Sequence, residues 1–142
     1  MSRLRELGEY VRKTFAVNLA ETAVFTADLD DGYHPADNLR VNSYDAYYKP
    51  FDGDNAVTIT VKLDGVHDVT HVVLKEHIPM SQRIECYAID AKQADGTYTE
   101  IAEGTTVGYQ KINRFDPVAT DEIRIRIKDS RICPILSFVG VY

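Results

Sequence analysis

The sequence predicts an all-β protein, an antiparallel β-sandwich of the jelly-roll kind preceded by one short α-helix. Three observations favour this fold. Many segments after residue 22 alternate apolar and polar residues with a period of two, which is typical of strands with one buried face. Connections rich in Asp, Gly and Pro separate them at intervals of about ten residues. No helical segment lies between the strands, so a parallel sheet with crossover helices is excluded.

The alternation is clearest in "IRIRIKD", where Ile123, Ile125 and Ile127 share one face and the two arginines between them share the other. Similar segments bring the number of strands to about eight. The predicted strands are 23–28, 56–63, 69–76, 83–91, 98–104, 108–115, 121–129 and 135–142. The predicted turns are "KLDGVHD", "QADGTY" and "FDPVATD", because Asp, Gly and Pro favour turn conformations.

Residues 2–15 have the pattern of an amphipathic helix that begins at Ser2 as its N-cap. Its apolar face is formed by Leu4, Leu7, Val11 and Phe15. An isolated helix of this length is unstable in water, so its apolar face must pack against this domain or against a neighbour.

Length and composition limit the classes of protein that fit. A chain of 142 residues fits one domain. The net charge of −6 argues against a nucleic-acid partner, because phosphate binding needs a basic surface. No apolar run approaches the ~18 residues that cross a bilayer, so no membrane partner is expected. The charged N-terminus predicts no targeting signal in this chain. Cys86 and Cys133 lack metal-ligand spacing and are expected as separate buried side chains, although a disulfide stays open.

Three later segments resemble a known family. They are "LKEHIPMSQRI" (74–84), "EIAEGTTVGYQKINRF" (100–115) and "IRIRIKDSRICPILSFVGVY" (123–142). They resemble the C-terminal β-sandwich domain of bacterial α-L-fucosidases, a discoidin or coagulation-factor C-type domain with the galactose-binding-like fold. The resemblance covers about residues 1–142. It implies that residues 1–20 are a linker helix leaving a catalytic barrel absent from this chain, and that residues 21–142 are the discoidin-like domain.

The long polar region that ends near Asn55 departs from that family's pattern. The family usually carries Asn-Leu-x-Asp-Gly-Asp in this loop, whereas this chain reads "NLRVNSYDAYYKP". The resemblance implies a candidate structural calcium ion with Asn38 and Asp45 as ligands. Calcium prefers six to eight oxygen ligands that include carboxylates, and Val-Asn-Ser here replaces the acidic turn.

The resemblance also implies a function. Glycoside hydrolysis needs two carboxyl groups at a fixed separation, and fucosidases hold them on a barrel of about 250 residues. This chain is too short for one and is not expected to be an enzyme, whereas the parent protein is expected to be a retaining α-L-fucosidase, secreted or periplasmic. The expected partners are a glycan containing galactose or fucose, and the catalytic barrel. The alternative is a structural domain that braces the barrel through the helix and the 76–83 turn, with no ligand of its own.

Sugar recognition commonly combines an aromatic face with charge-assisted hydrogen bonds to hydroxyl groups. The candidate carbohydrate-binding residues on the loops are His34, Tyr44, Phe51, His77 and Arg83. Each has a structural alternative. His34 suits a solvated loop, Tyr44 and Phe51 suit packing as well as display, and Glu76 and Arg83 suit pairing with each other or with the backbone.

Three tyrosines are predicted to be structural. Tyr47 and Tyr48 are expected to lie under the long loop as part of the core. Tyr109, which follows a glycine-rich turn, is expected to pack in the sandwich.

Overall fold

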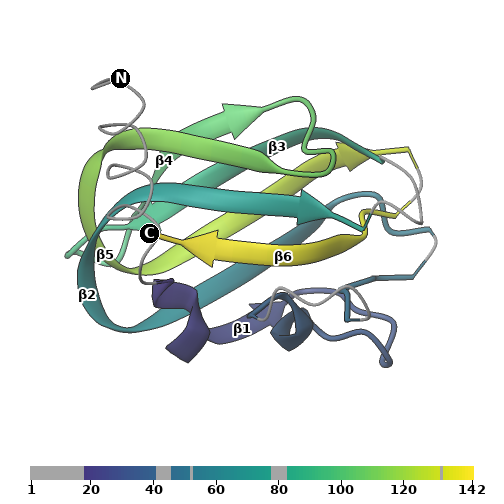
Figure 1. The fold of residues 1–142 in the computed structure, drawn as a ribbon, viewed down its shortest axis with the longest axis horizontal. Helices are drawn as coiled ribbons and strands as arrows, with labels where there is room; N and C mark the ends of the chain where they lie inside the picture. The colour runs from purple at the N-terminus through teal and green to yellow at the C-terminus, as the bar shows by residue number, and fades with distance from the viewer. Residues whose placement is uncertain (1–17, 41–45, 52, 78–82, 132) are drawn as a thin grey trace, which may run out of the picture.

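The computed structural model describes residues 18–40, 46–51, 53–77, 83–131 and 133–142, and it is an antiparallel all-β structure (Figure 1). Its elements are η1 (Leu19–Thr22), β1 (Val24–Ala27), η2 (Ala36–Arg40), β2 (Val57–Glu76), β3 (Ile84–Lys92), β4 (Tyr98–Gly104), β5 (Lys111–Ser130) and β6 (Leu136–Val141). The antiparallel all-β prediction is confirmed. Within the described ranges, the helical elements are the two 3-10 turns η1 and η2. The predicted helix over residues 2–15 lies outside those ranges, so the linker helix and its boundary at residue 20 stay predictions.

Two strands of twenty residues, β2 and β5, form the frame of the molecule. They pair with each other along most of their length and bend together, so each contributes to both layers of the sandwich (Figure 1). The strand order is β1-β2-β5-β3-β4, and β6 pairs with the second half of β2. In Figure 1 this second half and β6 form the front layer, with the first half of β2 behind them.

The predicted turns "KLDGVHD" and "FDPVATD" are wrong, because the chain bends there without leaving the sheet. The β2–β5 register shifts between Lys62 and His67 and again between Val69 and His71. Such irregularities bend a strand while most of its pairing is kept. The predicted turn "QADGTY" is confirmed: the backbone N–H of Gln93 donates to the Thr97 carbonyl, and Gly96 has a φ of 90°.

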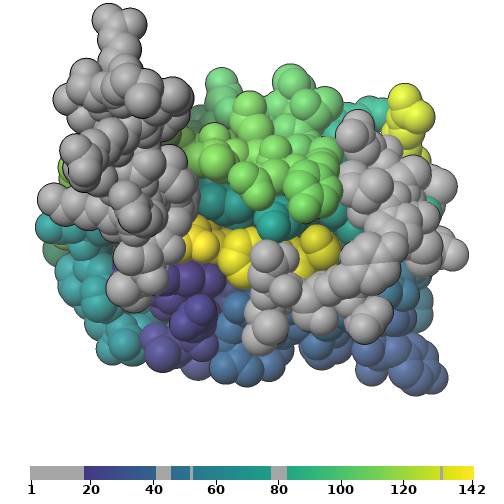
Figure 2. Space-filling model, in the orientation of Figure 1, coloured from purple at the N-terminus to yellow at the C-terminus, as the bar shows by residue number. Residues whose placement is uncertain are grey.

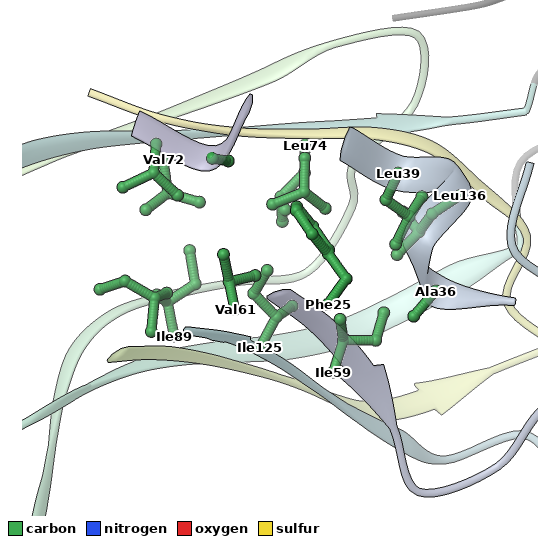
Figure 3. Close-up of a cluster of buried hydrophobic side chains, with 14 of the residues drawn as sticks. Phe25, Ala36, Leu39, Ile59, Val61, Val72, Leu74, Ile89, Ile125 and Leu136 are labelled. Carbon is green, nitrogen blue, oxygen red and sulfur yellow. The ribbon is translucent and has the colours of Figure 1, made fainter. Parts of the chain in front are cut away.

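The core lies between the two halves of the same long strands. Figure 3 shows Val72 and Leu74, from the second half of β2, facing Val61 and Ile125 across the core. The alternation read from "IRIRIKD" is confirmed, since all three of its isoleucines are buried. Burying one such side chain contributes about 1.5–3 kcal/mol.

The first described residue is tied to the last strand. The side-chain oxygen of Asn18 accepts hydrogen bonds from the backbone N–H of Ala20 and of Val141, both at 3.0 Å. It therefore caps η1 and holds the start of the described chain beside the C-terminal end of β6.

The outer face of the back layer carries a cluster of interlocked charges. Asp90 is buried although it lies on this face, because Arg124 and Arg126 lie over it and donate to its carboxylate at 2.9 and 2.6 Å. Arg126 also reaches Glu100 at 3.1 Å, and the Arg124 guanidinium lies 3.9 Å from the centre of the Tyr98 ring. These side chains pair their charges and hydrogen-bonding groups with one another, so the cluster links β3, β4 and β5.

Replacement of Gly104 by Ala should destabilise the fold, because a Cβ there would lie 2.5 Å from the Tyr87 hydroxyl oxygen. That hydroxyl donates to Asn113 at 2.7 Å inside the core. We expect a loss of about 1–3 kcal/mol in the free energy of unfolding, measured by urea denaturation. Gly65→Ala is the matched control, since open space surrounds Gly65. An equal effect at both positions would contradict this account.

The free energy of unfolding should depend on the charge of Asp90 at acidic pH. Burial alone raises the pKa of Asp90, but the hydrogen bonds from Arg126 and Arg124 lower it below its ordinary value. The charged form therefore stabilises the fold above the unfolded-state pKa of about 3.9, and that contribution is lost as the pH falls through the lower folded-state pKa. Asp90→Asn should give a flatter fall in stability between about pH 5 and pH 2 than the wild type. Asp116→Asn, at an exposed position, should retain the wild-type slope.

Candidate functional site

The candidate site lies at the end of the sandwich where β2 finishes and β6 begins, on the right of Figure 1. The long loop is fixed to this end by an isolated β-bridge between Tyr48 and Leu136. In this bridge the backbone N–H of Tyr48 donates to the Leu136 carbonyl at 2.8 Å. The Tyr48 ring is buried and its hydroxyl donates to the Leu29 carbonyl. Its predicted place in the core is confirmed.

Three rings from separate parts of the chain stack at this end. The His34 and Tyr47 rings are 4.3 Å apart between centroids, with an angle of 14° between their planes. The Tyr47 and His77 rings are 4.4 Å apart at 18°. Each ring carries a nitrogen or hydroxyl that can form hydrogen bonds. The stack therefore brings two of the predicted site residues, His34 and His77, onto opposite faces of one tyrosine.

His34 is held by an aspartate of its own loop. Its Nδ1 lies 2.6 Å from an Asp31 carboxylate oxygen. The other carboxylate oxygen accepts from the backbone N–H of Tyr33 at 2.8 Å and of His34 at 2.7 Å. Burial alone raises the pKa of Asp31, but these hydrogen bonds lower it below its ordinary value. A charged Asp31 fixes the orientation of the imidazole.

His77 occupies the other end of the stack and is only 8% exposed. Its backbone N–H donates to the Ile135 carbonyl at 2.9 Å, which continues the β2–β6 contact past the strand end. Burial lowers the pKa of His77, so the neutral imidazole predominates at pH 7. A neutral imidazole can both donate and accept a hydrogen bond.

Glu76 ties two loops together beneath the site. Its carboxylate is 2% exposed and accepts the backbone N–H of Arg83 at 2.7 Å, of Ile84 at 3.4 Å and of Gly108 at 3.0 Å. The backbone N–H of Glu76 donates in turn to the Gly108 carbonyl at 2.9 Å. The pairing of Glu76 with the backbone, one of the alternatives open from sequence, is confirmed.

The Arg83 side chain is half-buried beside Cys133. One guanidinium nitrogen lies 3.5 Å from the Cys133 carbonyl oxygen and 3.4 Å from its sulfur. Cys133 is buried and is not joined to Cys86 by a disulfide, so the prediction of separate thiols is confirmed, but Cys86 is only half-buried. The guanidinium group is thus positioned by the segment that leads into β6.

The remaining predicted residues do not join the ring stack. Phe51 is 62% exposed, and its carbonyl accepts from Asp54 in a turn. The side chain of Asn38 donates to the Tyr47 carbonyl at 2.9 Å, which supports the stack from below. Tyr44 and Asp45 lie outside the described residues. Among the residues that are described, no three His, Cys, Asp or Glu side chains are grouped to hold a metal ion, and the candidate calcium site stays a prediction.

Tyr47 is the site residue that the sequence did not indicate. It was expected in the core together with Tyr48, but only Tyr48 is fully buried there. Neighbouring residues in extended backbone point to opposite sides, so an adjacent Tyr-Tyr pair can place only one ring in the core. That rule could have assigned the other ring to the surface.

Comparison with known proteins decides the family. The F5/8 type C domain model matches residues 21–138. The chain belongs to the F5/8 type C domain family. The family has the galactose-binding-like fold, so this part of the prediction is confirmed. Within the described residues, no helix is long and apolar enough to cross a membrane.

This F5/8 type C domain is similar to part of the α-L-fucosidases. It is 25% identical over 146 residues to alpha-L-fucosidase 1 of Arabidopsis thaliana, covering 98% of this chain and 29% of that protein. It superposes on a GH29 fucosidase of Ruminococcus gnavus in complex with fucose with a TM-score of 0.89 and 27% identity, covering 99% of this chain and 29% of that one. The match is to the C-terminal region of these enzymes. Because plant and bacterial proteins both match, the resemblance does not assign a bacterial source.

The fold also occurs in a carbohydrate-binding module of another protein. The family 32 carbohydrate-binding module of C. perfringens NanJ, solved in complex with galactose, superposes with a TM-score of 0.77 and 19% identity. The alignment covers 87% of this chain and 95% of that module. At this identity the likeness shows a shared fold. The F5/8 type C domain therefore spans less than a third of the fucosidases that it matches but nearly the whole of this module.

Glu76→Gln should loosen the candidate site. The amide that replaces one carboxylate oxygen cannot accept a backbone N–H, so a buried donor loses its partner. We expect a loss of about 1–3 kcal/mol in unfolding free energy, measured by chemical denaturation. Glu103→Gln, on the exposed side of β4, is the matched control and should change stability by less than about 0.5 kcal/mol. Equal stability of the two variants would show that the Glu76 contacts contribute little.

Proposed function

We propose that this F5/8 type C domain is a non-catalytic carbohydrate-binding domain of an α-L-fucosidase, and that it recognises glycans containing galactose or fucose. The observation that carries the proposal is the His34–Tyr47–His77 stack at a loop end, where Glu76, next to His77 in the chain, holds the backbone of Arg83. The family membership and the likeness to fucosidase C-terminal regions support it.

The chemistry of this loop end suits a neutral sugar. Sugar hydroxyl groups need both donors and acceptors, and the neutral His77 imidazole and the Tyr47 phenol supply both. The guanidinium of Arg83 supplies donors in a fixed orientation. A shallow site on loops makes few contacts, so a monosaccharide should bind weakly.

A second candidate function is bracing of the catalytic barrel without a ligand of the domain's own. The observation that favours it is the Glu76 bridge, which holds the backbone of Arg83 and Gly108 in fixed positions that another domain could contact. The chain spans 29% of the Arabidopsis relative, so a parent protein has ample additional chain to make that contact. Under either candidate function we propose that the parent protein is secreted or periplasmic.

Isothermal titration of this chain against galactose, fucose and lactose tests the first candidate. Arg83→Ala should weaken binding about tenfold or more, since a hydrogen bond to a charged group contributes about 1.5–3 kcal/mol. The variant should stay folded, because the backbone N–H that Glu76 holds is retained. Lys62→Ala, on the exposed face of β2 away from the site, should leave affinity unchanged.

The absence of heat at millimolar sugar would reject carbohydrate binding. Bracing would then be tested in the full-length parent enzyme. There, Arg83→Ala should lower the unfolding temperature of the two-domain protein while leaving the isolated domain unchanged.

A further inference from the structure

The outer face of β2 leads directly away from the ring stack. Alternate residues of a strand face opposite sides, and Val72 and Leu74 face the core. Lys75 therefore lies on the outer face. His77 follows two residues later, just past the strand end, and the same alternation brings it to the side of Lys75.

A row of side chains runs from β6 across β2 at Lys75 to the turn that precedes β5. Phe138 of β6 is its direct partner in the sheet, and the Lys75 ammonium lies 5.5 Å from the centre of the Phe138 ring. On the other side, the ammonium lies 5.6 Å from the centre of the Tyr109 ring. The double hydrogen bond between Glu76 and Gly108 fixes this neighbouring turn against the end of β2.

Tyr109 is 71% exposed, so its predicted packing in the sandwich is wrong. The residue before it explains the difference. Gly108 has a φ of 66°, which reverses the chain and turns the next side chain outward. In Figure 2 the segment that leads into β5 stands above β6 on the visible face.

We infer that the sugar-binding surface continues from His77 over Lys75 to Tyr109, so that the ligand is an oligosaccharide rather than a single sugar. The inference rests on the proposed function. The exposed Tyr109 ring stacks on the C–H face of a second or third sugar residue, and the Lys75 ammonium donates to its hydroxyl groups. Both side chains belong to segments already held by Glu76, so little additional ordering is needed when a glycan binds.

Titration with ligands of increasing length tests this extension. The wild-type chain should bind a neutral fucosyllactose trisaccharide about two- to tenfold more tightly than galactose or fucose, which is the range expected for one added aromatic contact. Tyr109→Ala should remove that gain and leave monosaccharide affinity unchanged. Val66→Ala is the matched control, because it also removes an exposed apolar side chain but lies at the bend of β2.

The outcomes separate the extension from the proposed function. Binding of monosaccharides without any gain for the trisaccharide would overturn the extension alone. A gain that survives in Tyr109→Ala would overturn it as well. Absence of binding by both monosaccharide and trisaccharide would overturn the extension together with the proposed function. Circular dichroism of each variant checks that it is folded.

Discussion

The antiparallel pairing of β2 with β5 through a shared bend is the constraint on which the rest of the structure depends. Because both strands pass from one layer to the other, a single hydrogen-bonded ladder builds both walls of the core. β3 and β4 extend the ladder on one side, and β6 adds to β2 on the other. The ends of β2 and β6 that carry the candidate site are therefore positioned by the same ladder that closes the core.

Buried polar groups then fix the loops at that end. The Glu76 carboxylate accepts three backbone N–H groups from two segments far apart in the chain, which would otherwise be buried donors without partners. Asp31 does the same within the long loop. In both cases a short acidic side chain substitutes for regular secondary structure. The ring stack between the two loops can thus be rigid although no strand runs through it.

The sequence located the strand segments but was insufficient for the site. It predicted about eight strands where the described residues form a sheet of six, because β2 and β5 each join two predicted strands. Period-two alternation in "IRIRIKD" reflects burial of one face, a local property that survives in the fold. The bend of β2 was predicted as a turn because Asp64 and Gly65 favour turns, whereas long-range pairing with β5 decides the outcome. The stack of His34 on Tyr47 depends on contacts across the loop, which no local pattern records. The family motif marked the segment around Glu76, and pairing of its carboxylate with the backbone was one of the alternatives that the sequence left open.

The hydrogen bond between Asn18 and Val141 determines where the described chain begins in the fold. It places the point of entry at the C-terminal end of β6, whereas the ring stack lies beside the start of that strand. The start of the described chain and the ring stack therefore lie at opposite ends of β6. Contacts made at the ring stack thus need not disturb the hydrogen bond that holds the start of the described chain.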